Sequence, residues 1–234
     1  MSTPARGEWR VVDDVPDAFA RLVREECAAV LARREDGRPF RLGCSGGQSG
    51  RACFERLARE PLPWSRVACY FADERCVEPT SPDANAELVR RSLGAHVGEL
   101  AGFHPMSCEA GPAAYEALLR AHGLPDLLQL GLGPDGHTAS LFPGSAGLDA
   151  PPERLVVANE DPSGTNRFSR LSLTLGAIAR CGLVVFTVIE PSRAPALAAV
   201  AGGEDLPAAR VSAHRVVWLV SAEAAAGLHT AAGR

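Results

Sequence analysis

The amino-acid sequence predicts an α/β protein with a doubly wound, mostly parallel sheet covered by helices on both faces. Three observations support this prediction. Short apolar runs recur along the chain without strict alternation, amphipathic stretches separate them, and glycine-rich or polar loops directly follow several of the runs. Apolar runs that alternate with helical patterns indicate βαβ units, which build parallel sheets.

Seven short apolar runs are the expected strands. Several of them are continuously apolar, as expected of parallel strands that helices cover on both faces. In chain order the expected strands are Arg10–Val12, Phe40–Cys44, Val67–Ala72, Leu127–Leu132, Leu155–Ala158, Leu183–Ile189 and Arg215–Val220.

Helical periodicity fills the segments between these runs. The first expected helix places Phe19, Leu22, Val23, Cys27, Val30 and Leu31 on one face. The other expected helices are Arg51–Arg59, Ala84–Leu93, Ala113–His122, Thr174–Arg180 and Ala194–Ala201. Proline and glycine concentrate in Pro143–Pro152 and Gly202–Pro207, which is typical of loops. Because composition does not change along the chain, we expect residues 1–234 to form a single domain.

Composition excludes several classes of function. The chain has 234 residues, of which 46% are hydrophobic and 22% are charged, as in ordinary globular proteins. Its net charge of −4 gives no electrostatic reason to expect nucleic acid or an anionic membrane as a partner. All 24 basic residues are arginines. A Schiff-base lysine and a Walker-type phosphate lysine are therefore excluded.

Cysteine and histidine spacing bears on redox state and metal binding. The seven cysteines are scattered and form no C-x-x-C pair, so we expect no disulfide framework and a reducing compartment. The six histidines form neither H-x-H nor H-E-x-x-H, so we expect no dedicated metal site. Residues 1–10 are polar, and the apolar run Leu183–Ile189 is too short to span a membrane. These features predict a cytoplasmic protein.

The first informative loop, Gly43–Gly50, reads G-C-S-G-G-Q-S-G between an expected strand and an expected helix. Glycines let the backbone approach a ligand closely, and the free N–H groups at a helix start favour an anion such as phosphate. Two alternatives remain. The loop could be a flexible turn, or Ser45 could be the nucleophile of a G-x-S-x-G elbow, although no upstream H-G-G-G loop accompanies it.

The second loop places Asp73, Glu74 and Arg75 at the end of the expected strand Val67–Ala72. In an extended chain Asp73 and Arg75 share one face, and Glu74 lies on the other. A carboxylate beside a guanidinium suits the recognition of a polar ligand, because arginine offers a planar fork to phosphate oxygens. The alternative is an ordinary surface ion pair.

The third loop, Gly131–Pro143, reads G-L-G-P-D-G-H-T-A-S-L-F-P. Its glycines and proline predict a tight turn, with His137 near the start of a short helix. There the helix dipole would disfavour imidazolium and leave a neutral imidazole available as a base. The alternative is a structural histidine. A dinucleotide fingerprint is absent, because His137 stands where the third glycine of G-x-G-x-x-G would be.

Together these motifs resemble the 6-phosphogluconolactonase family, the hydrolases of the second pentose phosphate step. The family's superfamily also includes the glucosamine- and galactosamine-6-phosphate isomerases. The resemblance covers nearly the whole chain, in the family's order. It rests on Ser45-Gly46-Gly47, Ala72-Asp73-Glu74-Arg75, Asp83-Ala84-Asn85, Gly131–Pro143, Arg170–Thr174 and Pro207–Val211. The related isomerase/deaminases typically read D-E-Y and D-G-H-I-A-F-N-E-P, whereas this chain has Arg75 and continues T-A-S-L-F-P. The lactonase branch therefore fits better.

The chain departs from the family at three places. The family's S-G-G-S-T-P is replaced by S-G-G-Q-S-G, and Ala84 stands where serine is common. The late T-G-x-x-K segment reads V-I-E-P-S-R, so that Arg193 takes the place of a phosphate-binding lysine and Glu190 that of a glycine. An acid near the phosphate bears on substrate affinity, and we expect Glu190 to compete for Arg193 by pairing with it.

The resemblance implies a Rossmann-like fold of the sugar-phosphate isomerase type and hydrolysis of 6-phospho-D-glucono-1,5-lactone to 6-phosphogluconate. It implies His137 as the base that activates water, with Asp73 orienting either His137 or a sugar hydroxyl. The implied substrate-binding residues are Ser45, Gly46, Gly47, Ser49, Arg75, Asn85, Asp135, Arg170 and Arg193. We expect no metal and no organic cofactor. The expected partner is a small sugar phosphate lactone, bound by a monomer or small homo-oligomer. The alternatives are an amino-sugar phosphate isomerase/deaminase, a serine esterase and a non-catalytic sugar-phosphate-binding protein.

Overall fold

The fold was analysed in a computed structural model that describes residues 7–226 and 228. Its centre is a parallel sheet, which confirms the predicted fold class. From one edge to the other the strands are β1 (Glu8–Val12), β10 (Arg215–Ser221), β9 (Leu183–Val188), β6 (Leu127–Leu130), β2 (Phe40–Cys44), β3 (Val67–Phe71) and β5 (Gly102–Phe103).

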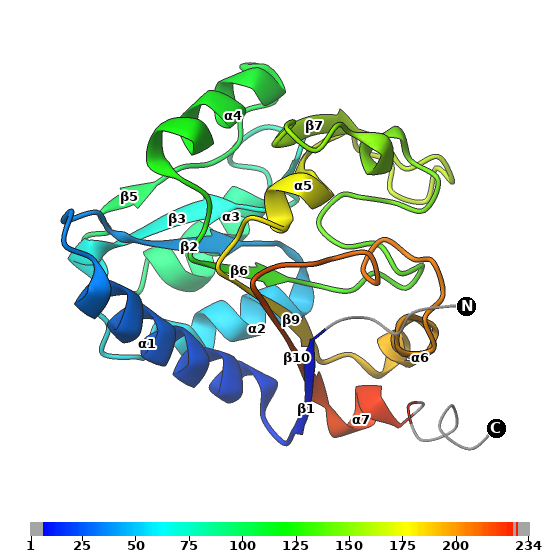
Figure 1. The fold of residues 1–234 in the computed structure, drawn as a ribbon, viewed down its shortest axis with the longest axis horizontal. Helices are drawn as coiled ribbons and strands as arrows, with labels where there is room; N and C mark the ends of the chain where they lie inside the picture. Colours follow the sequence, from blue (N-terminus) through cyan, green and yellow to red (C-terminus); the bar gives the residue numbers. More distant parts are fainter. Residues whose placement is uncertain (1–6, 227, 229–234) are drawn as a thin grey trace.

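Helices cover both faces of this sheet, with α1 and α2 below it and α4 and α5 above it in the view of Figure 1. The α-helices are α1 (Val15–Arg33), α2 (Gly47–Leu57), α3 (Asn85–Val89), α4 (Gly111–His122), α5 (Leu175–Ile178), α6 (Ala194–Ala201) and α7 (Ala222–Ala225). The 3₁₀ turns are η1 (Trp64–Arg66), η3 (Ala146–Asp149) and η4 (Pro191–Arg193), and η2 (Arg90–Gly94) is a π-helical turn that continues α3.

Side-chain chemistry explains the first helix and the packing of the sheet edge. Asp14 caps α1 by accepting a hydrogen bond from the Asp17 N–H at 2.8 Å. Across the sheet, the ring of Trp218 lies between those of Phe186 and Trp9, with centroid distances of 3.7 Å and 4.6 Å. The stack therefore joins β9, β10 and β1 through their side chains as well as their backbones.

A second, smaller sheet was not predicted. It is antiparallel and contains β4 (Asp73–Arg75), β8 (Arg170–Leu173) and β7 (Val156–Asn159). The run Leu155–Ala158 was expected to belong to the parallel sheet, and this expectation is wrong, because a short apolar run does not specify its partner. The other expected strands end within two residues of their predicted limits. Helix α2 begins at Gly47, four residues before its predicted start.

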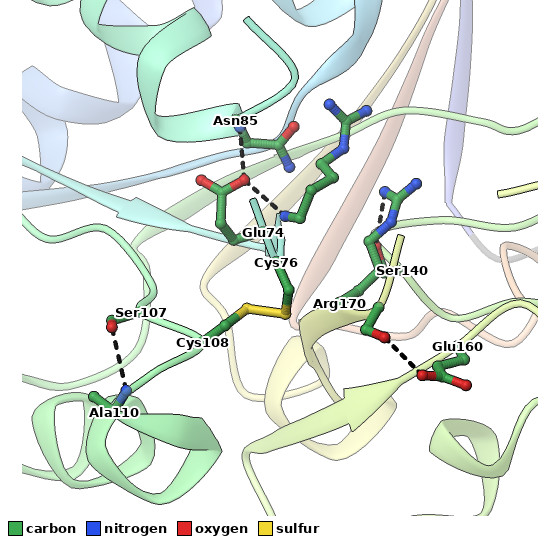
Figure 2. The surroundings of a disulfide bond; sticks show 11 residues. Glu74, Cys76, Asn85, Ser107, Cys108, Ala110, Ser140, Glu160 and Arg170 are labelled. Carbon is green, nitrogen blue, oxygen red and sulfur yellow. Dashed lines mark hydrogen bonds between the residues drawn. A yellow bond between two sulfur atoms is a disulfide. The ribbon is translucent and has the colours of Figure 1, made fainter. Parts of the chain in front are cut away.

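The structure contains a disulfide between Cys76 and Cys108, shown in Figure 2. The expectation of no disulfide is wrong for this pair. Cys76 directly follows β4, and Cys108 lies between β5 and α4. The two cysteines are 32 residues apart in the sequence, a spacing that does not predict a disulfide, and only the tertiary fold brings them together. The remaining cysteines (Cys27, Cys44, Cys53, Cys69 and Cys181) are free and buried. Over residues 7–226 and 228, no helix is both long and apolar enough to cross a membrane.

Candidate active site

The candidate site lies at the carboxyl ends of the parallel strands, at the point where the order in which strands are added to the sheet changes from one side to the other. From β2 the chain continues through α2 to β3 on one side, whereas from β6 it continues to β9 on the other. Such a switch point leaves a crevice in which α/β proteins bind ligands. A cavity of about 350 Å³ opens there.

Ten of the eleven residues predicted for the site line this cavity. They are Ser45, Gly46, Gly47, Ser49, Asp73, Arg75, Asn85, His137, Arg170 and Arg193. The eleventh residue, Asp135, contacts His137 instead. The cavity wall also includes Gln48, Gly131, Leu132, Gly133, Pro134, Ala139, Asn166 and Glu190. The folded chain therefore brings together the three loops that the sequence singled out.

The glycine-rich loop is built for close approach at the start of α2. Gly46 is the N-cap of this helix and provides no capping side chain, so the first N–H groups stay available to an anion. A Cβ atom at Gly46 would lie 1.9 Å from Asn85 Oδ1, which excludes any larger residue without displacing Asn85. Gly47 has a φ of 89°, a left-handed conformation that favours glycine.

Gln129 on β6 fixes the position of this loop. Its side-chain oxygen accepts the Ser45 N–H at 3.0 Å, and its side-chain nitrogen donates to Thr187 Oγ1 on β9 at 2.9 Å. Both Gln129 and Thr187 are completely buried. The side chain therefore links β2, β6 and β9 beneath the cavity. Sequence reasoning missed it, and the only signal was a glutamine inside an otherwise apolar strand.

Asp73 is the centre of a buried polar cluster on the cavity wall. Its carboxylate accepts hydrogen bonds from Ser45 Oγ at 3.1 Å and from Ser140 Oγ at 2.7 Å. Arg170 lies 3.9 Å from the same carboxylate. It also donates to Ser140 Oγ at 3.3 Å, a contact that Figure 2 shows. Asp73 therefore holds the hydroxyls of Ser45 and Ser140 and interacts with the guanidinium of Arg170. They leave the orientation of His137 to another residue.

Glu74 faces the opposite way and holds the start of α3. Its carboxylate accepts the backbone N–H groups of Asn85 and Ala86, each at 2.7 Å. Figure 2 shows the contact with Asn85. Burial raises the pKa of Glu74, although these backbone hydrogen bonds work in the other direction. The Asn85 side chain donates to the Asp73 carbonyl at 3.0 Å. Its buried Oδ1 atom accepts no hydrogen bond from the described residues, which leaves an acceptor for a ligand hydroxyl.

His137 lies in a tight turn rather than at the start of a helix, so the expected helix dipole does not act on it. The orienting group is Asp135, whose Oδ1 atom lies 2.5 Å from His137 Nδ1. Burial raises the pKa of Asp135, but hydrogen bonding to His137 more than offsets this effect and lowers the pKa below its usual value. A carboxylate only accepts hydrogen bonds, so in the neutral imidazole Nδ1 carries the proton and Nε2 keeps its lone pair. Gly133 makes room, since a Cβ there would lie 2.1 Å from Nδ1.

Three arginines supply positive charge to the cavity. Arg75 and Arg170 stand opposite each other on β4 and β8. Arg75 donates to the Asp83 carbonyl at 2.6 Å, while the buried Nε atoms of Arg75 and Arg170 have no partner among the described residues. Burial lowers the pKa of Arg170 despite the neighbouring Asp73 carboxylate. Arg193 reaches the cavity from η4, after β9.

Glu190 interacts with Ser49 instead of Arg193. Ser49 Oγ donates to Glu190 Oε2 at 2.7 Å and accepts the Ile189 N–H at 3.3 Å. The expected Glu190–Arg193 pair is absent from the ion pairs of the described chain. This contact joins the first turn of α2 to the segment that follows β9.

Two further wall residues were not predicted. Asn166 is held in place because its backbone and side-chain nitrogens both donate to Asp161, at 3.0 Å and 2.8 Å. Ala139 has a φ of 49°, an uncommon conformation for a residue other than glycine, and strain of this kind concentrates at functional sites. Within the described residues no group of three or more His, Cys, Asp or Glu side chains is placed to hold a metal ion.

Comparisons with known proteins show which family this chain is similar to. Residues 12–218 match the family model described as glucosamine-6-phosphate isomerases/6-phosphogluconolactonase. The chain is 34% identical over 237 residues to the 6-phosphogluconolactonase of Mycobacterium tuberculosis, covering 92% of this chain and 94% of the relative. It is 37% identical over 204 residues to the 6-phosphogluconolactonase of Pseudomonas aeruginosa, covering 80% and 82%.

Solved structures show the same similarity. The crystal structure of the Thermotoga maritima 6-phosphogluconolactonase superposes with a TM-score of 0.80 at 25% identity, covering 92% of this chain and all of that one. A monomeric glucosamine-6-phosphate deaminase superposes with a TM-score of 0.73 at 18% identity, covering 94% and 99%. The latter likeness concerns the fold alone.

Proposed function

The chain belongs to the family of glucosamine-6-phosphate isomerases and 6-phosphogluconolactonases, and we propose that it hydrolyses 6-phospho-D-glucono-1,5-lactone to 6-phosphogluconate, the second step of the oxidative pentose phosphate pathway. The observation that carries this proposal is the Asp135–His137 pair, set at 2.5 Å on a cavity that also contains three arginines. A histidine base suits the lactone carbonyl, and arginine cations in the same cavity suit the phosphate of this substrate.

His137 is the general base in this proposal. With Nδ1–H donated to Asp135, the free Nε2 atom takes a proton from a water molecule, and the oxygen of that water attacks C1 of the lactone. When the C1–ring oxygen bond breaks, His137 returns the proton to the departing ring oxygen. General base catalysis of this kind typically gives about 10²–10⁴-fold acceleration.

Backbone and side chains around the cavity fix the substrate. The N–H groups at Gly46 and Gly47 stabilise the negative charge that develops on the carbonyl oxygen or bind the sugar. Asn85 and the Asp73 cluster bind sugar hydroxyls, and Arg75 and Arg193 bind the phosphate through their planar forks. Arg170 keeps the Asp73 cluster neutral. Holding the lactone through its phosphate adds a contribution from positioning.

Ser45 acts in this scheme through loop geometry and not as a nucleophile. Its hydroxyl donates to Asp73, an acceptor whose own position depends on Ser140. A nucleophilic serine instead needs a neighbouring base held by a third group. We expect the Ser45→Ala enzyme to keep substantial activity, and mass spectrometry of the native enzyme during turnover to detect no acyl group on Ser45.

The proposed function is tested by hydrolysis of freshly prepared 6-phosphogluconolactone, corrected for the spontaneous rate. The native enzyme should hydrolyse it, and His137→Ala should lower kcat by about 10²–10⁴-fold with little change in substrate binding. The same preparation should release no ammonia from glucosamine 6-phosphate. Ammonia release without lactone hydrolysis would instead support the isomerase/deaminase, and near-native kcat in His137→Ala would remove His137 from the mechanism.

The proposal also covers the organisation of the protein. The cavity draws its wall from the segments after β2, β3, β6 and β9 of the large sheet, and from β4, β8 and the loop before β8. This arrangement supports a single domain in which one chain supplies every residue of the site.

A further inference from the structure

Building on the proposed function, we infer that Glu190 is a specificity-determining residue whose negative charge weakens the hold of the site on the substrate's phosphate. Glu190 lines the same cavity as His137 and Arg193, and it is the residue that precedes η4. A carboxylate in a cavity that binds a phosphate opposes the binding of that phosphate.

The carboxylate is held close to the start of α2. Ser49, in the first turn of that helix, donates to Glu190 Oε2 at 2.7 Å. The exposed N–H groups at this helix start are the ones that favour an anion. Glu190 therefore presents one negative charge to this helix start and to the cavity that Arg193, proposed to bind the phosphate, also lines. Its contact with Ser49 keeps that charge from swinging freely into solvent.

No cation of the described chain cancels this charge directly. Arg193 lies three residues further along and forms no ion pair within 4.0 Å among the described residues. The other acidic wall residue, Asp73, lies 3.9 Å from Arg170. After that pairing, Arg75 and Arg193 supply two positive charges and Glu190 supplies one negative charge. Replacing Glu190 by a neutral residue therefore doubles the uncompensated positive charge of the cavity from +1 to +2.

The size of the effect follows from the charge of a phosphate ester. At neutral pH such a group carries about −1.5 to −2 charges, because its second pKa is about 6. Two charges several ångströms apart at a partly exposed site, screened by physiological salt, change affinity by about three- to tenfold. The product keeps the same phosphate. Glu190 therefore weakens the binding of substrate and product alike and speeds release of the product.

The test compares Glu190→Gln with a matched charge change outside the cavity, Glu99→Gln. The glutamine keeps an acceptor for Ser49 Oγ while removing the charge. Calorimetry should show that Glu190→Gln lowers the Kd of 6-phosphogluconate by about three- to tenfold and leaves the Kd of gluconate unchanged. Glu99→Gln should change neither. An unchanged or weakened affinity for 6-phosphogluconate in Glu190→Gln, or an equal gain for gluconate, would overturn the inference.

Ser49→Ala separates charge from hydrogen bonding, because it removes the hydroxyl and keeps the Glu190 carboxylate. This variant should not bind 6-phosphogluconate more tightly, and a gain as large as that of Glu190→Gln would overturn the role of charge. Circular dichroism and thermal melting check that each variant is folded. These titrations measure binding and require no turnover. If the native protein failed to hydrolyse the lactone, the proposed function would be contradicted, but the effect of Glu190 on 6-phosphogluconate binding could still be measured.

Discussion

Replacing Asp135 by asparagine tests whether this carboxylate sets the protonation of the catalytic imidazole. Asparagine has nearly the same shape, but its side chain has no charge and can donate as well as accept. In the native structure Asp135 Oδ1 lies 2.5 Å from His137 Nδ1, and this contact keeps the proton on Nδ1. In Asp135→Asn the amide nitrogen can donate to Nδ1, which would place the proton on Nε2 and remove the base.

The structure sets the expected magnitude. A hydrogen bond to a charged group contributes about 1.5–3 kcal/mol. The Asp135 side chain is 37% exposed and that of His137 is 19% exposed, so water screens the pair and the lower part of this range applies. With about 1.4 kcal/mol per tenfold change in rate, 1.5–2 kcal/mol corresponds to a loss in kcat of about 10- to 30-fold.

The assay is steady-state hydrolysis of phosphorylated and unphosphorylated gluconolactone by native enzyme and Asp135→Asn. Because the pair acts at the lactone carbonyl, kcat should fall by the same factor on both substrates, with KM for the phosphorylated one nearly unchanged. A kcat within twofold of native would refute the reasoning. A rise in KM confined to the phosphorylated lactone would do so as well, because it would assign Asp135 to phosphate binding.

Four further predictions follow from the structure. Arg193→Ala should lower kcat/KM by about 10- to 150-fold on the phosphorylated lactone, the range expected for charged hydrogen bonds, and scarcely change it on the unphosphorylated one; equal losses would indicate a structural role. Gly46→Ala should sharply reduce activity because its Cβ would lie 1.9 Å from Asn85 Oδ1, whereas the control Gly98→Ala, with open space around it, should remain active. Cys108→Ser should lower the free energy of urea unfolding by about 3–4 kcal/mol, because the disulfide closes a loop with a sequence separation of 32. Dithiothreitol should destabilise the native protein by the same amount and should not affect the variant. Burial raises the pKa of Asp126, but hydrogen bonds from Arg41 and Arg34 outweigh burial and lower this pKa overall. The contribution of Asp126 to stability is therefore full above about pH 4 and is lost as the pH falls further. In urea unfolding, native protein should lose stability below about pH 4 more steeply than Asp126→Asn.

The parallel sheet and the three site loops were predictable because their signals are local. A buried parallel strand such as Leu183–Val188 is apolar at nearly every position, and helices must lie between such strands. The carboxyl ends of these strands meet at one edge of the sheet, so the polar loops that follow them had to converge. The small antiparallel sheet carries no such signal, since the burial of Arg170 on β8 depends on its partners on β4.

Partnerships between distant residues set the limit of sequence-based prediction. The sequence placed both Asp135 and Asp73 at the site but left open which carboxylate orients His137, because this depends on how the turn folds back. Gln129 reads as an exception within an apolar strand until its hydrogen bonds to the loop after β2 and to β9 are seen. Likewise, Cys76 and Cys108 become neighbours only through the placement of β4 and of the loop that follows β5.

The order of strands in the sheet has a consequence for the synthesis of the protein. Strand β1 is among the first parts of the chain to be made, yet its neighbour in the sheet is β10, about 200 residues later. At about 5–20 residues per second, roughly 10–40 s of translation separate the two strands. Strand β9, buried at every position and apolar except at Thr187, is made near the end of this interval, so for about 1–5 s it lacks its neighbour on the β10 side. A ribosome that stalls before Arg215 would therefore hold a chain that contains every strand of the site but has an unpaired, mostly apolar edge, a natural binding surface for chaperones.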